Sequence, residues 1–254
     1  MANKCKVIVV MPAFNQAKTL PSLLQKFFQL KLTNAAISKI VIVDDASTDN
    51  TRQIIAKMKS AKIKYVREQT NVGPSQAILD GFRTAYKLVG ASKNCIVVRM
   101  DSDGDHNPFD IAKLVAPIVN KRADAAVIDA DFGLSNGLID LVYNRIFGVL
   151  QGKTLLLPAF RQTSPGFYAF KADTLKSLIR FREHYVKVYA KKYGKVDLYG
   201  IDLSVFAFFY SSIKIIKIKA HVLEKGRRSL GKIYGQGKEI LRHFRVIKEL
   251  SRLN

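Results

Sequence analysis

Three carboxylates occupy alternate positions directly after an apolar run of the sequence. Asp101, Asp103 and Asp105 follow residues 95–100, which have the composition of a buried strand. Hard oxygen ligands of this kind suit Mg²⁺ or Mn²⁺, and such an ion commonly holds a diphosphate. Ligands of open α/β sheets bind at the carboxyl ends of the strands, where these carboxylates would lie. The pattern therefore predicts a metal-assisted nucleotide site, with an acidic turn that caps the next helix as the alternative.

The residues after two other expected strands carry further polar groups. Residues 12–15 follow the run 6–11, and two adjacent carboxylates, Asp44 and Asp45, follow the run 39–43. No glycine-rich turn follows the first run and no Walker-type loop occurs, which argues against NAD binding and ATP hydrolysis. Asp45 could accept hydrogen bonds from a base or a ribose, whereas an isolated acidic pair would more simply be solvated turn residues or a helix cap. Their expected position beside the first carboxylate cluster favours the nucleotide role.

Strand-like and helix-like patterns alternate through the first 100 residues. Continuous apolar runs indicate buried strands, and apolar residues at intervals of three and four indicate helices. The expected strands are 6–11, 39–43, 63–66 and 94–100, and the expected helices are 17–30, 51–58 and 74–88. Because parallel neighbours need helical crossovers, this order predicts an α/β fold with a mostly parallel, doubly wound sheet.

Four ordered motifs resemble the N-terminal half of a family 2 glycosyltransferase with the GT-A fold. They are VIVVMPAFN at 7–15, IVDDASTDNT at 42–51, NVG at 71–73 and MDSD at 100–103. Four later segments resemble the dolichyl-phosphate mannose synthase and polyprenyl-phosphate glycosyltransferase branch, namely 107–108, 144–147, 161–167 and 226–229. The resemblance implies an inverting transferase that uses a UDP- or GDP-linked sugar, with Mg²⁺ or Mn²⁺ as cofactor.

The resemblance also implies roles for individual residues. The implied nucleotide pocket contains Pro12, Ala13, Asn15, Asp44, Asp45, Ser47, Gly73, Asp101 and Ser102. The implied metal ligands are Asp101, Asp103 and Asp105, with Asp103 as the direct contact. The implied catalytic residues are Asp103, Asp202 and Arg145, and the implied acceptor or phosphate contacts are Arg145, Arg161, Arg227 and Arg228. A hydroxyl acceptor would need a general base, for which we nominate Asp202; a cap for a helix at 203–210 is the alternative.

Two positions depart from the polyprenyl-phosphate pattern. Asp131 stands where that branch usually carries an Arg, and an acidic side chain there would repel a phosphate. Gln162 replaces the Asp that precedes the Ser-Gly-Phe-Arg stretch of the branch. A polyprenyl phosphate at a membrane surface is the first expectation for the acceptor. The alternatives are a glycan hydroxyl of a surface polysaccharide or glycolipid, and a catalytically weak relative that only binds the nucleotide sugar.

The chain is strongly basic, with 42 Lys and Arg against 20 Asp and Glu and a formal net charge of +22. This charge favours polyanionic partners. Because no nucleic-acid-binding motif accompanies it, an anionic membrane surface is expected rather than nucleic acid. We expect a GT-A domain at 1–220, with a nucleotide-sugar half at 1–120 and an acceptor half at 121–220. A basic loop and an amphipathic helix at 221–254 would follow, and this helix could lie in the headgroup layer or pack on the domain.

The expected location is cytoplasmic, peripheral on the cytoplasmic face of a membrane. The longest uncharged stretch, 203–213, is too short to span a bilayer. Cys5 and Cys95 fall inside expected strands, where buried, inert thiols are expected and a reducing compartment follows.

Overall fold

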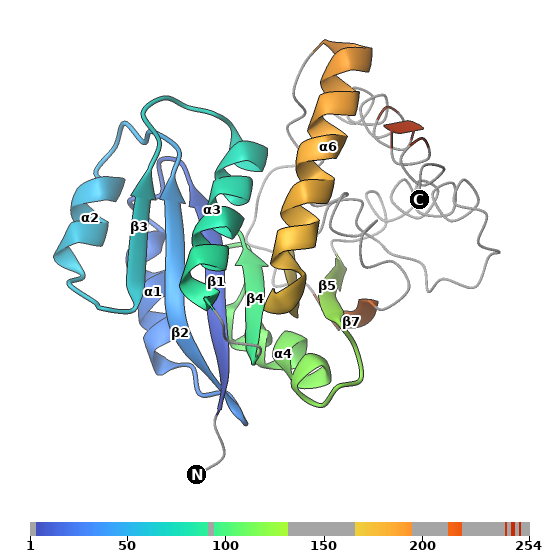
Figure 1. Ribbon diagram of the computed structural model, residues 1–254. Helices are drawn as coiled ribbons and strands as arrows, with labels where there is room; N and C mark the ends of the chain where they lie inside the picture. The colour runs from blue at the N-terminus through green and yellow to red at the C-terminus, as the bar shows by residue number, and fades with distance from the viewer. Residues whose placement is uncertain are drawn as a thin grey trace.

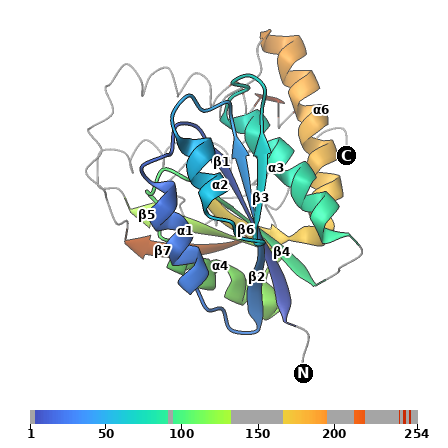
Figure 2. The same cartoon turned by 90° about the vertical axis from the view of Figure 1, so that its left-hand side faces the viewer.

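The computed structural model describes residues 4–90, 94–131, 166–194 and 213–219, together with residues 242, 245, 246 and 249. Within these ranges seven strands form one sheet with the spatial order β3-β2-β1-β4-β6-β5-β7. Figure 1 labels these strands apart from β6, which is labelled in Figure 2. The strands are β1 (Cys5–Ala13), β2 (Ala35–Asp44), β3 (Ile63–Arg67), β4 (Cys95–Met100), β5 (Ala125–Asp131), β6 (Phe167–Lys171) and β7 (Ile213–Lys219).

The sheet is mostly parallel, which confirms the expected α/β class. β1 pairs in parallel with β2 and β4, β2 with β3, and β5 with β7. β6 is antiparallel to both of its neighbours, β4 and β5. Its first residue, Phe167, therefore pairs with Met100, the last residue of β4. This reversed strand, which sequence reasoning did not predict, brings Gly166 to the loop that carries Asp101.

Helices cover both faces of the sheet (Figure 2). The helices are α1 (Leu20–Gln29), α2 (Thr51–Lys57), α3 (Pro74–Val89), α4 (Ile111–Val119) and α6 (Leu175–Tyr193), with short 3-10 turns at Pro108–Asp110 and Ala172–Thr174. One hydrophobic core lies between the sheet and α1 and α4, and a second lies between the sheet and α3 and the start of α6.

Strand β1 shows why its sequence is a continuous apolar run. Val7 and Val9 point into the first core, while Ile8 and Val10 point into the second. A strand covered by helices on both faces has no solvent side, so apolar residues occupy every position. Such a strand forms the centre of the sheet and holds the loop at its carboxyl end in a fixed place.

The strands and helices expected within residues 4–100 are all present, and only their ends differ. The helix expected at 17–30 begins at Leu20, because the N–H groups of Thr19 and Leu20 both donate to the Gln16 carbonyl in a turn. Cys5 and Cys95 are buried in their strands, as expected. Burial raises the pKa of Cys5, and burial followed by the neighbouring Cys5 raises the pKa of Cys95 to about 11. None of the described helices has the length and apolar character needed to cross a membrane.

Candidate functional site

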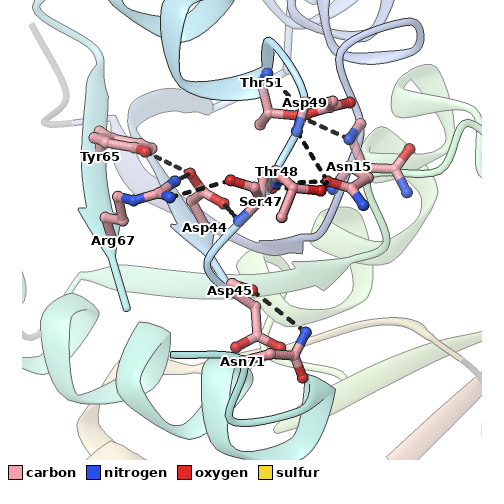
Figure 3. A network of polar contacts seen from close by, with 11 residues as sticks. Asn15, Asp44, Asp45, Ser47, Thr48, Asp49, Thr51, Tyr65, Arg67 and Asn71 are labelled. Carbon is pink, nitrogen blue, oxygen red and sulfur yellow. Dashed lines mark hydrogen bonds and ion pairs between the residues drawn. The ribbon is translucent and has the colours of Figure 1, made fainter. Parts of the chain in front are cut away.

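Asn15, which follows β1, joins two loops at the carboxyl edge of the sheet. Its side-chain oxygen accepts hydrogen bonds from the N–H groups of Thr48 (2.8 Å) and Asp49 (3.3 Å). Its own N–H donates to Ser47 Oγ at 2.9 Å (Figure 3). Asn15 has a φ of 56°, a left-handed conformation that asparagine tolerates better than most residues. The β1 and β2 loops are therefore held together through Asn15.

Asp44, the last residue of β2, is fully buried. One carboxylate oxygen accepts hydrogen bonds from Tyr65 and Arg67 on β3, and the other accepts the Ser47 N–H at 2.8 Å (Figure 3). Burial alone would raise the pKa of Asp44, but the hydrogen bonds from Ser47, Tyr65 and Arg67 outweigh it and lower the pKa. Asp44 thus remains an anion inside the protein and fixes the start of the β2 loop.

Asp45 is only 3% exposed and points to the start of α3. Its two carboxylate oxygens accept the N–H groups of Val72 (2.6 Å) and Gly73 (2.9 Å). Gly73 has a φ of 85° and a ψ of 159°, a conformation open essentially to glycine alone. The Ala13 carbonyl accepts the Asp45 N–H at 2.8 Å. Asp45 therefore connects the end of β1, the β2 loop and the N-terminus of α3.

The loop after β4 is attached to the β1 loop through Ser102. The Ser102 hydroxyl donates to the Pro12 carbonyl at 2.6 Å, and the Ser102 carbonyl accepts the Thr19 hydroxyl at 2.9 Å. These two bonds place the Asp-x-Asp segment beside the residues that follow β1.

Asp101 lies between two basic side chains. Arg99 Nη1 is 2.8 Å from Asp101 Oδ1, and His106 Nε2 is 3.4 Å from Asp101 Oδ2. Arg99 also donates to the Gly166 carbonyl, and the His106 ring packs 5.0 Å from the ring of Phe167. Burial alone would raise the pKa of Asp101, but the Arg99 and His106 contacts lower it below its usual range. Asp101 is therefore a charged group held from both sides.

The structure allows a test of whether the predicted ligands fit a divalent cation. Asp103 Oδ1 accepts the Asp105 N–H at 3.1 Å, so these two carboxylates share one short turn. In the described ranges, no three acidic, cysteine or histidine side chains gather into a complete metal cage. Mg²⁺ is usually held by one or two carboxylates together with substrate phosphates and water. Asp103 and Asp105 are carboxylates of the kind that such a set requires, and Asp101 is an ion-pair partner of Arg99.

The nine residues expected in the nucleotide pocket all lie at the carboxyl edge of the sheet, on the ends of β1, β2 and β4 and at the start of α3. Five other predicted residues lie outside the described part of the chain: Arg145, Arg161, Asp202, Arg227 and Arg228. Their roles stay predictions. For Asp131, the last residue of β5, only the backbone is described.

Sequence reasoning did not identify Arg99 or Thr19 as parts of this site. A signal for Arg99 was present, because it is the one charged residue in the apolar run 95–100 and lies two positions before Asp101. Residues two apart on a strand point to the same face, which places Arg99 on the side of Asp101. Thr19 carried no comparable signal, since its partner Ser102 is 83 residues away.

Comparisons with known proteins identify the family of this chain. The sequence matches the model of glycosyl transferase family 2 over residues 8–191. An uncharacterised protein of Methanocaldococcus jannaschii is 29% identical over 239 residues, which cover 86% of this chain and 98% of that protein. A UDP-N-acetylglucosamine–dolichyl-phosphate N-acetylglucosaminyltransferase of Methanococcus voltae is 31% identical over 141 residues. That match covers 50% of this chain, which spans only about half the length of that relative (52%).

A solved structure shares the fold at low sequence identity. Glucosyl-3-phosphoglycerate synthase from Mycobacterium tuberculosis, crystallised with Mn²⁺, UDP and glucosyl-3-phosphoglycerate, superposes with a TM-score of 0.63 at 17% identity. The superposition covers 96% of this chain and 80% of that one. At this identity the likeness establishes the GT-A type of fold. The family match over more than half of its length shows that this chain belongs to glycosyl transferase family 2.

Proposed function

We propose that this protein transfers a sugar from a nucleotide-diphospho-sugar to a polyprenyl phosphate at a membrane surface. The observation that carries the proposal is the joining of three strand-end loops into one site. Hydrogen bonds of Asn15, Asp45 and Ser102 connect the ends of β1, β2 and β4 to one another. The motifs that resemble the family's donor site are therefore neighbours in space as well as in order along the sequence.

In this proposal the nucleotide lies over the joined loops. The base or ribose lies beside Asp45, whose carboxylate also accepts the Val72 and Gly73 N–H groups. Asp44, Asn15 and Ser102 act indirectly, because their polar atoms hold the loops in place. The donor is UDP- or GDP-linked, and UDP is favoured because the relative from Methanococcus voltae is named for a UDP-sugar.

Asp103 and Asp105 are the residues that would hold Mg²⁺ or Mn²⁺, with Asp103 as the principal ligand. When bound, the cation would supply charge neutralisation for the departing nucleoside diphosphate. Asp101 contributes differently, since Arg99 and His106 keep its carboxylate ionised and fixed. In this proposal Asp103 and Asp105 face the diphosphate, while Asp101 is held by Arg99 and His106.

The reaction is an in-line displacement that inverts the anomeric configuration. The acceptor oxygen forms a bond to the anomeric carbon as the bond from that carbon to the diphosphate oxygen breaks. The electron pair of the broken bond leaves with the nucleoside diphosphate. A phosphate acceptor is already ionised and needs little base catalysis, whereas a glycan hydroxyl needs a base, for which Asp202 remains our nominee.

The polyprenyl-phosphate acceptor is supported by the relative named for dolichyl phosphate. A glycan hydroxyl remains the second candidate because Asp131 ends β5 on the same sheet edge. In the first case the protein works as a peripheral enzyme at the cytoplasmic face of a membrane. The domain at 1–220 carries the chemistry.

A transfer assay tests the proposal. The purified protein is mixed with Mn²⁺, a panel of UDP- and GDP-sugars, and polyprenyl phosphate in anionic vesicles. We expect transfer to the lipid that is lost in Asp103→Asn and kept in Asp124→Asn. Asp124 is a suitable control because it precedes β5 at the opposite edge of the sheet and pairs with Lys171. Nucleotide-sugar binding without lipid transfer would shift the acceptor to a glycan hydroxyl or identify an inactive relative.

A further inference from the structure

One face of α6 carries a continuous row of basic side chains. Lys176, Arg180, His184, Lys187 and Lys191 follow one another at intervals of four, four, three and four residues, and all five are exposed. This spacing keeps them on one side of a helix, along about 22 Å at a rise of 1.5 Å per residue. We call these five residues the α6 basic stripe.

The opposite side of α6 attaches the helix to the protein. Leu178, Arg182, Tyr185 and Tyr189 are buried there, at 2% exposure or less. The Arg182 guanidinium lies 4.9 Å from the centre of the Tyr185 ring, which stacks on Tyr189 at 6.1 Å. A helix held this firmly by one side presents its other side as a fixed surface.

One acidic residue of α6 borders the stripe. Glu183 lies three positions after Arg180 and four before Lys187, and its carboxylate pairs with Arg83 of α3 at 2.7 Å. Within the described ranges, no ion pair joins a stripe residue to a carboxylate. The stripe is therefore a mainly basic surface, which attracts polyanions.

The described C-terminal residues pack next to this helix. Arg242 lies 5.2 Å above the Tyr193 ring, and Glu249 pairs with Lys192 at 3.0 Å. Val246, between them in sequence, is fully buried, whereas Arg245 is exposed. The apolar side chain described in this segment is thus used for packing on the protein. Of the two arrangements expected for the C-terminal helix, packing on the domain agrees with these contacts.

The direction of α6 relates the stripe to the site. β6 runs antiparallel to β4, so the chain leaves β6 at the amino edge of the sheet. α6 then returns toward the carboxyl edge and rises past the end of β4 (Figure 1). The C-terminal end of the stripe, at Lys187 and Lys191, therefore lies toward the edge that carries Asp103.

We propose that the α6 basic stripe binds an anionic membrane surface by charge alone, without insertion of apolar side chains. This contact places the carboxyl edge of the sheet, and with it the donor site, next to the headgroup layer. The proposal rests on the proposed function for its purpose, since a lipid-phosphate acceptor must be reached at that layer. Each basic residue near an anionic bilayer adds a small increment of affinity, and salt weakens all of them together.

Vesicle binding tests this without any sugar transfer. The full-length protein is sedimented with vesicles that contain about 30% phosphatidylglycerol. The variant Arg180→Gln, Lys187→Gln, Lys191→Gln removes three stripe charges. The matched control, Lys57→Gln, Lys62→Gln, Lys64→Gln, removes three exposed charges at the β3 edge. We expect the stripe variant to bind at least about tenfold more weakly and the control to change less than about threefold.

Three results would overturn the proposal. Equal losses in both variants would show a general effect of net charge. Binding of the wild-type protein that persists in about 0.5 M NaCl would show insertion of apolar groups instead. Unchanged vesicle binding, with a selective loss of affinity for single-stranded RNA, would assign the stripe to nucleic acid. Transfer to a short-chain, water-soluble polyprenyl phosphate does not need the stripe, so the stripe variant should retain this activity. If the wild-type protein itself shows no such transfer, the proposed function is contradicted instead.

Discussion

At the scale of single residues, the carboxylate of Asp101 is held by three neighbouring residues and remains partly exposed. Arg99 and His106 face its two oxygens, and Gly166 lies against it. A Cβ atom on Gly166 would lie 2.0 Å from Asp101 Oδ2 and 2.5 Å from Arg99 Nη1. Contacts this close are not tolerated, so glycine is required at 166 for Asp101 and Arg99 to keep their positions.

We therefore expect Gly166→Ala to impair catalysis more than folding. The added methyl group must displace the Asp101 carboxylate, and a small displacement in a site can lower the rate by about 100-fold. Steady-state kinetics measures kcat, and thermal unfolding measures Tm.

The control is Gly81→Ala in α3, whose Cβ would lie 2.4 Å from Val10 Cγ1 in the second hydrophobic core. This overpacking should cost about 1–3 kcal/mol of stability and leave kcat of the folded enzyme close to wild type. A Gly166→Ala enzyme with wild-type kcat would show that the position of Asp101 does not matter.

At the scale of elements, the site depends on connections between the carboxyl ends of neighbouring strands. Asp44 on β2 binds Tyr65 and Arg67 on β3, so the edge strand is held by side chains as well as by its backbone. Hydrogen bonds of Ser102 and Thr19 hold the β4 loop against the β1 loop. The loops are thus held in place by the sheet before any ligand arrives.

We expect Asp44→Asn to lower the free energy of unfolding by about 1–3 kcal/mol at pH 7, because buried hydrogen-bond partners lose their anion. The pKa of Asp44 is lowered in the folded protein, so the unfolded chain takes up its proton first as the pH falls. The stabilisation is fully present above about pH 5 and is lost progressively as the pH falls below about 4, toward the lowered pKa of the folded protein. Urea unfolding of both proteins at pH 7 and about pH 3 should show a smaller difference at the lower pH.

Asp124→Asn provides the comparison, since its ion pair with Lys171 is partly exposed and should be worth less than about 1 kcal/mol. An Asp44→Asn difference that stays constant with pH would mean that the charge of Asp44 does not carry the stabilisation.

At the scale of the whole molecule, a mostly parallel sheet collects polar residues from distant segments at one edge, while a basic helix rises beside that edge. The sequence was sufficient to predict the strands and helices up to residue 100, because each of them has a local pattern of apolar residues and is followed by turn residues. The grouping of Asp45, Ser102 and Asp103 also followed, since carboxyl ends of parallel strands share an edge.

What could not be predicted depends on contacts between distant parts of the chain. The reversal of β6 rests on pairing of Phe167 with Met100, 67 positions earlier, and no local pattern in a five-residue strand specifies direction. The hydrogen bond from Arg99 to the Gly166 carbonyl follows from that reversal. The burial of Val246 likewise depends on how a distant segment packs, which its amphipathic pattern left open between a membrane and the domain.

The central claim is that the joined loops of β1, β2 and β4 bind a nucleotide diphosphate with the help of a divalent cation at Asp103. Calorimetric titration of UDP and GDP into the protein, with and without Mn²⁺, tests this most directly. We expect binding that requires Mn²⁺, is lost in Asp103→Asn and is unchanged in Asp124→Asn. Binding of neither nucleotide to the wild-type protein, or equal binding by Asp103→Asn, would contradict the claim.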